Sequence, residues 1–139
     1  MNRRLLRYSN SFGVWTYRVS GGALGGGAKK VLVVTAPGRR TGVPRSTCVR
    51  YLRHEGGYVV WGTASGARQD PDWFRNLRAS DTAEVQVGKE TLTVRARELD
   101  GDERARVWRD VVLAQVPGVA RYEKKAQRTI PVAVLTPSG

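Results

Sequence analysis

The sequence has few of the residues that build cross-links, metal sites and membrane spans. It contains one cysteine, Cys48, and one histidine, His54, in 139 residues. A disulfide within the chain is therefore excluded, and we expect no metal site. No apolar run reaches the roughly 20 residues that a transmembrane helix needs, and the first 20 residues lack the apolar core of a signal peptide. We expect a cytoplasmic protein.

Acidic residues are also scarce. The chain has 12 aspartates and glutamates against 24 lysines and arginines, which gives a net charge of +12. Such an excess predicts an anionic partner, and charge alone leaves nucleic acid, an anionic small molecule and an acidic membrane surface open. The aromatic residues are scattered, and no exposed pair occurs on one predicted strand. We therefore do not expect a nucleic-acid-binding module.

The apolar pattern predicts one mainly β domain over residues 1–139. Period-two and continuous apolar runs predict six strands, at 30–36, 46–53, 58–64, 83–88, 91–100 and 130–137. The short glycine-containing links HEGG and GKE favour antiparallel pairing of neighbours. Six antiparallel strands in a chain of this length favour a small closed or split β-barrel with flanking helices over a sandwich.

Three helices are predicted between these strands. Asp70 followed by Pro71 fits an N-cap and a first helical position, and so predicts a helix over DWFRNLRAS. A second helix begins at Asp100 or Asp102 and ends at a Pro-Gly pair, and a short third one is predicted over ARYEKKAQR, before the last strand.

The spacing of apolar and aromatic residues among arginines in residues 1–20 predicts a separate amphipathic helix. The glycine-rich residues 21–29 predict a flexible connection from it to the first strand. We expect this helix to pack over the barrel, and peripheral contact with the inner face of a cell membrane is the alternative.

The stretch TAPGRRTGVPR, which follows the first predicted strand, predicts an anion-binding turn. Its glycines permit backbone conformations in which amide N–H groups converge on an anion, and its arginines and threonine add charge and a hydroxyl. A basic hairpin turn without a ligand is the alternative. The candidate phosphate-binding residues are Gly38, Arg39, Arg40, Thr41, Gly42 and Arg45.

A second stretch, WGTASGARQDPDWFRNL, predicts a platform for a flat aromatic ligand. Small residues at the end of the third predicted strand let a ring approach the backbone, and the Trp73 indole could cover a ring face. Packing of Trp73 and Phe74 in the core is the alternative, and both can hold at once. The candidates here are Thr63, Ala64, Ser65, Trp73 and Asn76.

Four motifs in order, GRRTGVPR, DPDWFRNL, GDERARVW and IPVAVLTP, resemble the deazaflavin-dependent nitroreductase and F420H2-dependent quinone reductase family of actinobacteria. The likeness covers about residues 31–137. It implies a split β-barrel of the flavin-reductase type and hydride transfer from reduced coenzyme F420 to an electron-poor small molecule such as a quinone, enone or nitro compound. The family's phosphate-holding turn falls on Arg39, Arg40, Thr41 and Arg45, and its ring contacts fall on Thr63, Trp73 and Asn76.

The resemblance implies F420 as the cofactor, whose phosphodiester and glutamate tail would suit the positive charge. FMN on the same fold, and a carrier that binds F420 without catalysis, are the alternatives. Related nitroreductases have three tyrosines before the last strand, where this chain has Val116, Val119 and Tyr122. Tyr122 is therefore predicted to border the acceptor and donate a proton or hydrogen bond, with solvent as the competing proton source. A monomer or a homodimer is expected.

Overall fold

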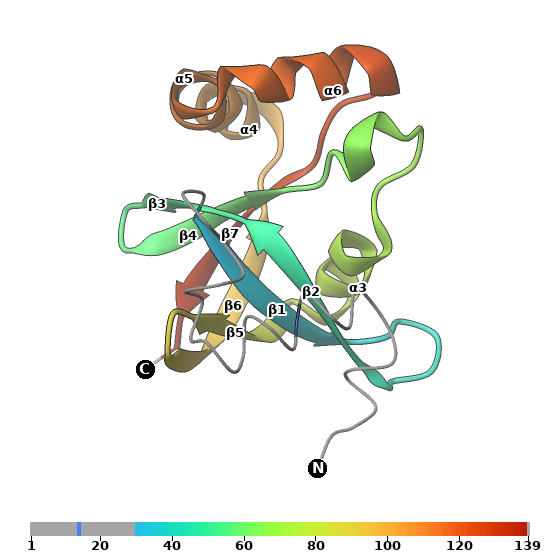
Figure 1. Ribbon diagram of the computed structural model, residues 1–139, viewed down its shortest axis with the longest axis vertical. Helices are drawn as coiled ribbons and strands as arrows, with labels where there is room; N and C mark the ends of the chain where they lie inside the picture. The colour runs from blue at the N-terminus through green and yellow to red at the C-terminus, as the bar shows by residue number, and fades with distance from the viewer. Residues whose placement is uncertain (1–13, 15–29, 139) are drawn as a thin grey trace.

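The computed structural model describes residue 14 and residues 30–138, and its strands form one curled antiparallel sheet (Figure 1). In sheet order they run β2-β1-β5-β6-β7-β4-β3. The mainly β, antiparallel class is thus confirmed. The strands of the described residues are β1 (Val31–Pro37), β2 (Pro44–Arg50), β3 (Leu52–His54), β4 (Gly57–Trp61), β5 (Thr82–Val87), β6 (Glu90–Glu98) and β7 (Val132–Pro137).

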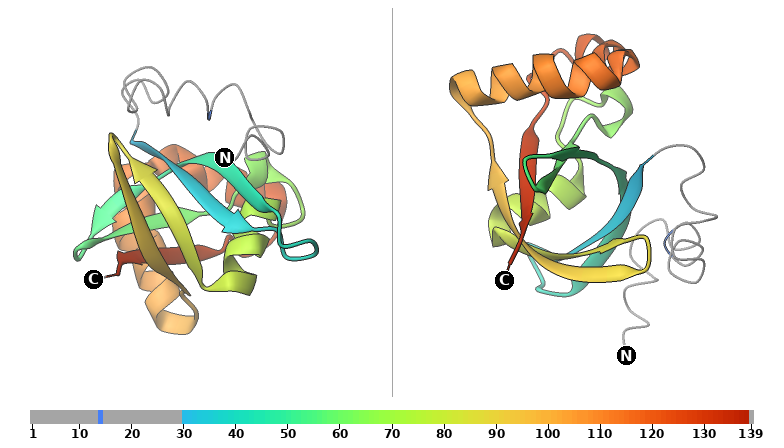
Figure 2. Two further views of the ribbon diagram at one scale, coloured as in Figure 1. Left: turned by 90° about the horizontal axis from the view of Figure 1, so that it is seen from below. Right: turned by 90° about the vertical axis from the view of Figure 1, so that its left-hand side faces the viewer.

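The described residues hold seven strands rather than the six predicted, because the predicted strand 46–53 changes partner at Tyr51. Before this residue β2 pairs with β1, and after it β3 pairs with β4. The Tyr51 N–H donates to the Lys30 carbonyl at 3.0 Å, outside both ladders. Since β2 and β3 stand at opposite ends of the sheet order, this corner joins the two ends and curls the sheet toward a barrel (Figure 2).

The interior of the curled sheet is filled partly by α3 (Asp72–Ser80). Its Phe74 and Leu77 side chains are each only 1% exposed. They belong to the same buried cluster as Leu32, Val34, Val60, Val85, Val94 and Leu135 from the strands. Full burial of one such side chain contributes about 1.5–3 kcal/mol. The helix is therefore anchored inside the sheet along one side.

A second apolar cluster lies between β4 and the helices that follow β6. The side chains of β4 alternate between the two clusters: Tyr58 and Val60 face the sheet interior, whereas Val59 and Trp61 face the helices. A strand buried on both faces explains the unbroken apolar run YVVW. The helical elements are α4 (Gly101–Val107), a π-helical turn (Trp108–Val112), α5 (Leu113–Gln115), a 3₁₀ turn (Pro117–Val119) and α6 (Ala120–Ala126).

The helix predictions between the strands are confirmed in place, with one error at a start. Asp100 takes the N-cap position of α4, which decides between the two alternatives. For α3 the N-cap position is Pro71 and not Asp70. The Asp70 carboxylate instead forms ion pairs with Arg78 and Arg128. A tertiary interaction has displaced the expected capping role.

The predicted helix over residues 1–20 and the connection 21–29 lie outside the described residues, apart from Val14. This side chain is buried against Val33, with Val31 and Cys48 beside it. Val31 and Val33 alternate with the inward-facing Leu32, so Val14 packs on the outer face of the sheet. Within residue 14 and residues 30–138, no helix is long and apolar enough to span a bilayer.

Gly57 lies where the backbone of β4 comes close to that of its neighbour β7, which leaves no room for a side chain. A Cβ at this position would lie 2.8 Å from the Leu135 carbonyl oxygen, a backbone atom that can move only with its strand. We expect Gly57→Ala to lower the free energy of unfolding by about 1–3 kcal/mol. Gly118→Ala is the control, because a Cβ there has nothing within 4 Å. Urea unfolding of both variants checks this, and equal stabilities would contradict it.

Candidate functional site

A cleft of about 300 Å³ lies where the turn between β1 and β2 meets α3. Three arginines and one aspartate line it, so its potential is positive and suits an anion. The structure thus brings Asn76 of α3 together with residues of the turn that lie more than 30 positions earlier in the sequence. This arginine cleft is lined by Gly38, Arg39, Arg40, Thr41, Arg45, Asp72 and Asn76.

The backbone of the β1–β2 turn is hydrogen-bonded to itself. The Gly38 N–H donates to the Val43 carbonyl and the Gly42 N–H to the Gly38 carbonyl, both at 2.8 Å. The N–H groups of Gly38 and Gly42 are therefore engaged within the turn, and convergence of amides of this turn on an anion stays a prediction. Gly42 supplies a left-handed conformation, with φ of 76°. The side chains of Arg39, Arg40 and Arg45 line the cleft.

Asn76 joins this turn to α3. It is 6% exposed, and its Oδ1 accepts hydrogen bonds from the backbone N–H of Arg39 at 3.0 Å and from Arg39 Nη1 at 2.8 Å. One buried oxygen therefore fixes both the position of the turn and the direction of the guanidinium. Sequence reasoning grouped Asn76 with the ring contacts, whereas the structure places it in the arginine cleft.

Asp72 gives the cleft its negative charge. Its side chain is 81% exposed and lies 3.1 Å from Arg39 Nη2 and 3.9 Å from Arg75 Nη1. Exposed pairs of this kind contribute little, about 0–1 kcal/mol, so an incoming anion can compete for Arg39.

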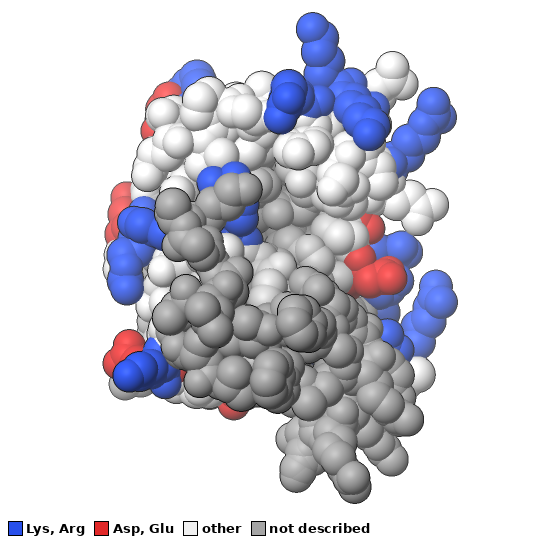
Figure 3. Space-filling model, viewed as in Figure 1, with Lys and Arg blue, Asp and Glu red and all other residues white. Residues whose placement is uncertain are grey.

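On the face seen in Figure 3, basic side chains outnumber acidic ones along the edge that runs past α6 and α3.

The loop from β4 to α3, residues 62–71, contains the predicted ring platform. Thr63 has right-handed backbone angles, and three residues with positive φ follow it: Ala64 at 48°, Ser65 at 53° and Gly66 at 86°. Non-glycine residues rarely adopt this conformation, and such strain is concentrated at functional sites. A right-handed residue followed by a left-handed one also points successive N–H groups to one side.

α3 borders both the arginine cleft and the β4–α3 loop. A Cβ on Gly62 would lie 2.9 Å from Pro71 Cδ, which shows how closely the two ends of the loop approach. Phe74 is core, whereas Trp73 is half-buried and meets the Phe74 ring edge-on at 5.4 Å. Trp73 follows the lining residue Asp72 on α3, and neither Trp73 nor the loop residues of the predicted platform line the cleft. Figure 1 shows the turn, α3 and the loop along one side of the molecule.

Comparison with known proteins decides the family. The model of the F420H(2)-dependent quinone reductases matches residues 11–137. An F420H(2)-dependent quinone reductase of Mycobacterium tuberculosis is 30% identical over 125 residues, which cover 86% of this chain and 84% of that protein. This chain belongs to the F420H2-dependent quinone reductase family. The predicted membership is confirmed, and the chain is an oxidoreductase of this class.

Solved structures agree with this assignment. An F420-H2 dependent reductase has a TM-score of 0.67 and 30% identity, covering 76% of this chain and 93% of its own. A structure described as a domain-swapped dimer has a TM-score of 0.70 and 27% identity, covering 88% and 90%. A member of the pyridoxinephosphate oxidase family from Clostridium acetobutylicum has a TM-score of 0.51 at 12% identity and covers 91% and 83%. The split-barrel fold is thereby confirmed.

The region that has three tyrosines in related nitroreductases keeps one of them in this reductase, Tyr122, and has valines at the other two positions. Val119 is buried and Val116 packs against the same helical cluster, so both positions turn inward. Tyr122 is half-buried on α6, with the Arg121 guanidinium 5.9 Å from its ring centre. α6 packs against the β4–α3 loop, where Lys125 covers Gly66. Tyr122 thus lies one turn before the contact with the predicted platform, and its role stays a prediction.

Sequence reasoning missed Arg128, which precedes β7. Its guanidinium pairs with Asp70 at 2.6 Å and donates to four backbone carbonyls of the β4–α3 loop. A single arginine before an apolar strand carries no motif signal. The misassigned N-cap Asp70 was the available hint, because an aspartate that does not cap its helix needs another partner.

Asn76 is expected to stabilise the reductase through Arg39. Asn76→Ala removes the acceptor of a backbone N–H and of a guanidinium, and we expect it to lower the free energy of unfolding by about 1–3 kcal/mol. Asn76→Asp keeps an oxygen at this position and should be less destabilising. Urea unfolding measures both, and an Asn76→Ala protein as stable as the wild type would contradict the anchoring role.

Proposed function

We propose that this reductase holds the anionic stem of coenzyme F420 in the arginine cleft and its ring beside residues 63–65, and reduces a quinone-type small molecule. The observation that carries the proposal is the convergence of Arg39, Arg40 and Arg45 on a cleft that is also lined by α3, the helix that follows a strained loop of small residues. Family membership supports the cofactor and the chemistry. The assignment of individual residues is our own.

The donors of the cleft fit a phosphodiester. Guanidinium groups present planar, paired N–H donors that match phosphate oxygens in geometry and remain charged at any working pH. Arg39 is already oriented by Asn76, so less side-chain freedom is lost when an anion binds. The cleft has a volume of about 300 Å³. We place the anionic stem in it and the ring outside it.

The β4–α3 loop and α3 offer the adjoining place for a ring. Thr63, Ala64 and Ser65 have short side chains, so a flat ring can approach their backbone, and the half-buried Trp73 indole lies on the neighbouring helix. When bound, reduced F420 supplies the hydride. The residues of this chain hold the stem, orient the ring against the acceptor and exclude water.

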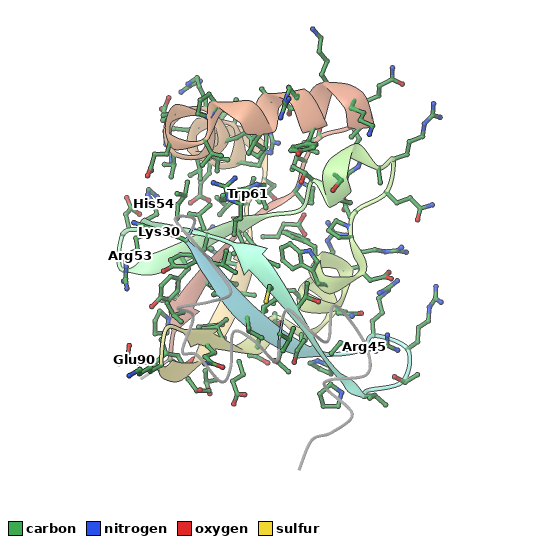
Figure 4. All side chains as sticks on the ribbon, in the orientation of Figure 1. Lys30, Arg45, Arg53, His54, Trp61 and Glu90 are labelled. Atoms are coloured by element: carbon green, nitrogen blue, oxygen red, sulfur yellow. The ribbon has the colours of Figure 1, made fainter. Side chains whose placement is uncertain are left out.

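Two exposed arginines provide a test of the arginine cleft. Arg40 lines the cleft, whereas Arg53 lies over Tyr58 at the β3–β4 hairpin, 5.3 Å from the ring centre. Figure 4 shows Arg53 on the side of the molecule opposite to Arg45. Arg40→Gln and Arg53→Gln each remove one positive charge, so their net charges are equal and only the location differs.

We expect Arg40→Gln to weaken F420 binding about tenfold, equivalent to about 1.4 kcal/mol, and Arg53→Gln to leave it within about twofold. Fluorescence titration with F420 and with FMN, each at two salt concentrations, measures the affinities. Equal loss in the two variants would mean that only overall charge attracts the cofactor. Tighter binding of FMN than of F420 would overturn the cofactor assignment for this site.

Tyr122 is the proposed hydrogen-bond or proton donor to the acceptor. Tyr122→Phe keeps the ring and removes the hydroxyl, and we expect kcat with F420H2 and a water-soluble quinone to fall at least about tenfold. Tyr51→Phe is the matched control, since Tyr51 is also half-buried but belongs to the sheet corner. An unchanged kcat in Tyr122→Phe would assign proton delivery to solvent. F420 binding without any turnover would support a carrier instead.

A further inference from the structure

Arg128 contacts the β4–α3 loop through all three nitrogens of its guanidinium. Nε donates to the Ala67 carbonyl at 2.9 Å, and Nη1 donates to Asp70 Oδ1 at 2.6 Å. Nη2 is shared among the carbonyls of Gly62 at 3.1 Å, Thr63 at 3.2 Å and Gln69 at 3.1 Å. The side chain is 15% exposed. One arginine therefore grips the loop at its start and near its end.

We propose that Arg128 is a positioning residue that holds residues 63–65 in the shape that accepts the deazaflavin ring, an inference that rests on the proposed function of this loop. Arg128 does not line the arginine cleft, and it reaches the platform through the carbonyls of Gly62 and Thr63. It acts on the cofactor through the loop.

The loop needs such a clamp because its backbone is strained. Ala64 and Ser65 both have positive φ, a conformation that is unfavourable for non-glycine residues and persists only where the surroundings enforce it. Two short-range hydrogen bonds lie within the loop, from the Gly66 N–H to Thr63 and from the Ala67 N–H to Ala64. The hydrogen bonds of Arg128 join the start of the loop, at Gly62, to a point near its end, at Gln69.

A series of ion pairs connects Arg128 to the sheet through Asp70, Arg78 and Glu98. Asp70 accepts from Arg128 with one oxygen and from Arg78 Nη2 with the other, at 2.9 Å. Arg78 in turn forms two hydrogen bonds with Glu98 of β6, at 2.6 and 2.9 Å. The hydrogen bond to Glu98 raises the pKa of the Arg78 guanidinium above its ordinary value. The loop is thus connected through α3 to the wall of the sheet.

Lysine could not replace arginine in this role. An ammonium group has three donors on one atom, so it could pair with Asp70 but not also reach carbonyls at both ends of the loop. Arg128→Lys therefore keeps the charge and removes the clamp. We expect it to weaken F420 binding about tenfold and to lower kcat, with an altered absorbance spectrum of the bound ring, because the platform is loosened and the arginine cleft is untouched.

Arg104 provides the matched control. It is 14% exposed, pairs with Glu123 of α6 at 3.6 Å and donates to the carbonyl of Ile130, in the segment before β7, at 2.6 and 3.1 Å. These contacts do not reach the β4–α3 loop. Arg104→Lys removes an equally buried guanidinium. We expect it to lower the melting temperature as Arg128→Lys does, while the F420 affinity and the bound spectrum remain those of the wild type.

A readout without cofactor separates this inference from the proposed function. Arg68 is an exposed residue of the loop, so the rate of limited trypsin cleavage after it reports how tightly the loop is held. We expect Arg128→Lys to raise this rate about tenfold, Asp70→Asn to raise it less and Arg104→Lys to leave it unchanged, at temperatures well below unfolding.

Equal cleavage rates in Arg128→Lys and Arg104→Lys would overturn the clamp, whether or not F420 binds. A faster cleavage in Arg128→Lys with an unaltered F420 affinity and spectrum would overturn the link between the clamp and the ring. Failure of the wild type to bind F420 would instead reject the proposed function, and the cleavage rates would still decide the clamp. If Arg128→Lys does not fold, the comparison of Asp70→Asn with Arg104→Lys decides.

Discussion

The burial of Phe74 and Leu77 inside the curled sheet is the interaction on which the candidate site depends. These side chains anchor α3 against the strands, and α3 carries Asn76 and Trp73 between and beside them. Asn76 then holds Arg39, and through it the β1–β2 turn. The arginine cleft therefore forms because α3 packs against the strands of the sheet and holds the β1–β2 turn through Asn76.

The large positive charge has two uses that composition could not separate. Some arginines face open space in the cleft, where an anion can reach them, as Arg40 does. Others are engaged by partners within the chain: Arg78 pairs with Asp70 and Glu98, and Arg128 pairs with Asp70 and the loop carbonyls. Asp70 and Glu98 are the acidic partners of these two arginines. The net charge of +12 counts both kinds of arginine alike.

Much of the fold was predictable because local patterns matched it. The alternation in β5 and β6 and the continuous apolar run of β4 predicted these strands, and the hairpin links predicted their pairing. The error at Tyr51 has a physical reason, since an apolar strand pattern does not reveal where the strand leaves one neighbour for another. The capping role of Asp70 was misjudged for a related reason. A carboxylate or an amide bonds to whichever partner the folded chain brings nearest.

The class of this protein could be inferred from its residues alone: an antiparallel barrel-type sheet, a basic turn followed by a loop of small residues, and motifs whose order identifies an F420H2-dependent reductase family. The roles of individual residues depended on how the chain folds. Folding brought Asn76 to Arg39, turned Val116 and Val119 inward, and joined Arg128 to a loop about 60 residues earlier in the chain. Residue types set which bonds can form, and packing of distant segments selects among them, because each polar group pairs with a neighbour that exists only after folding.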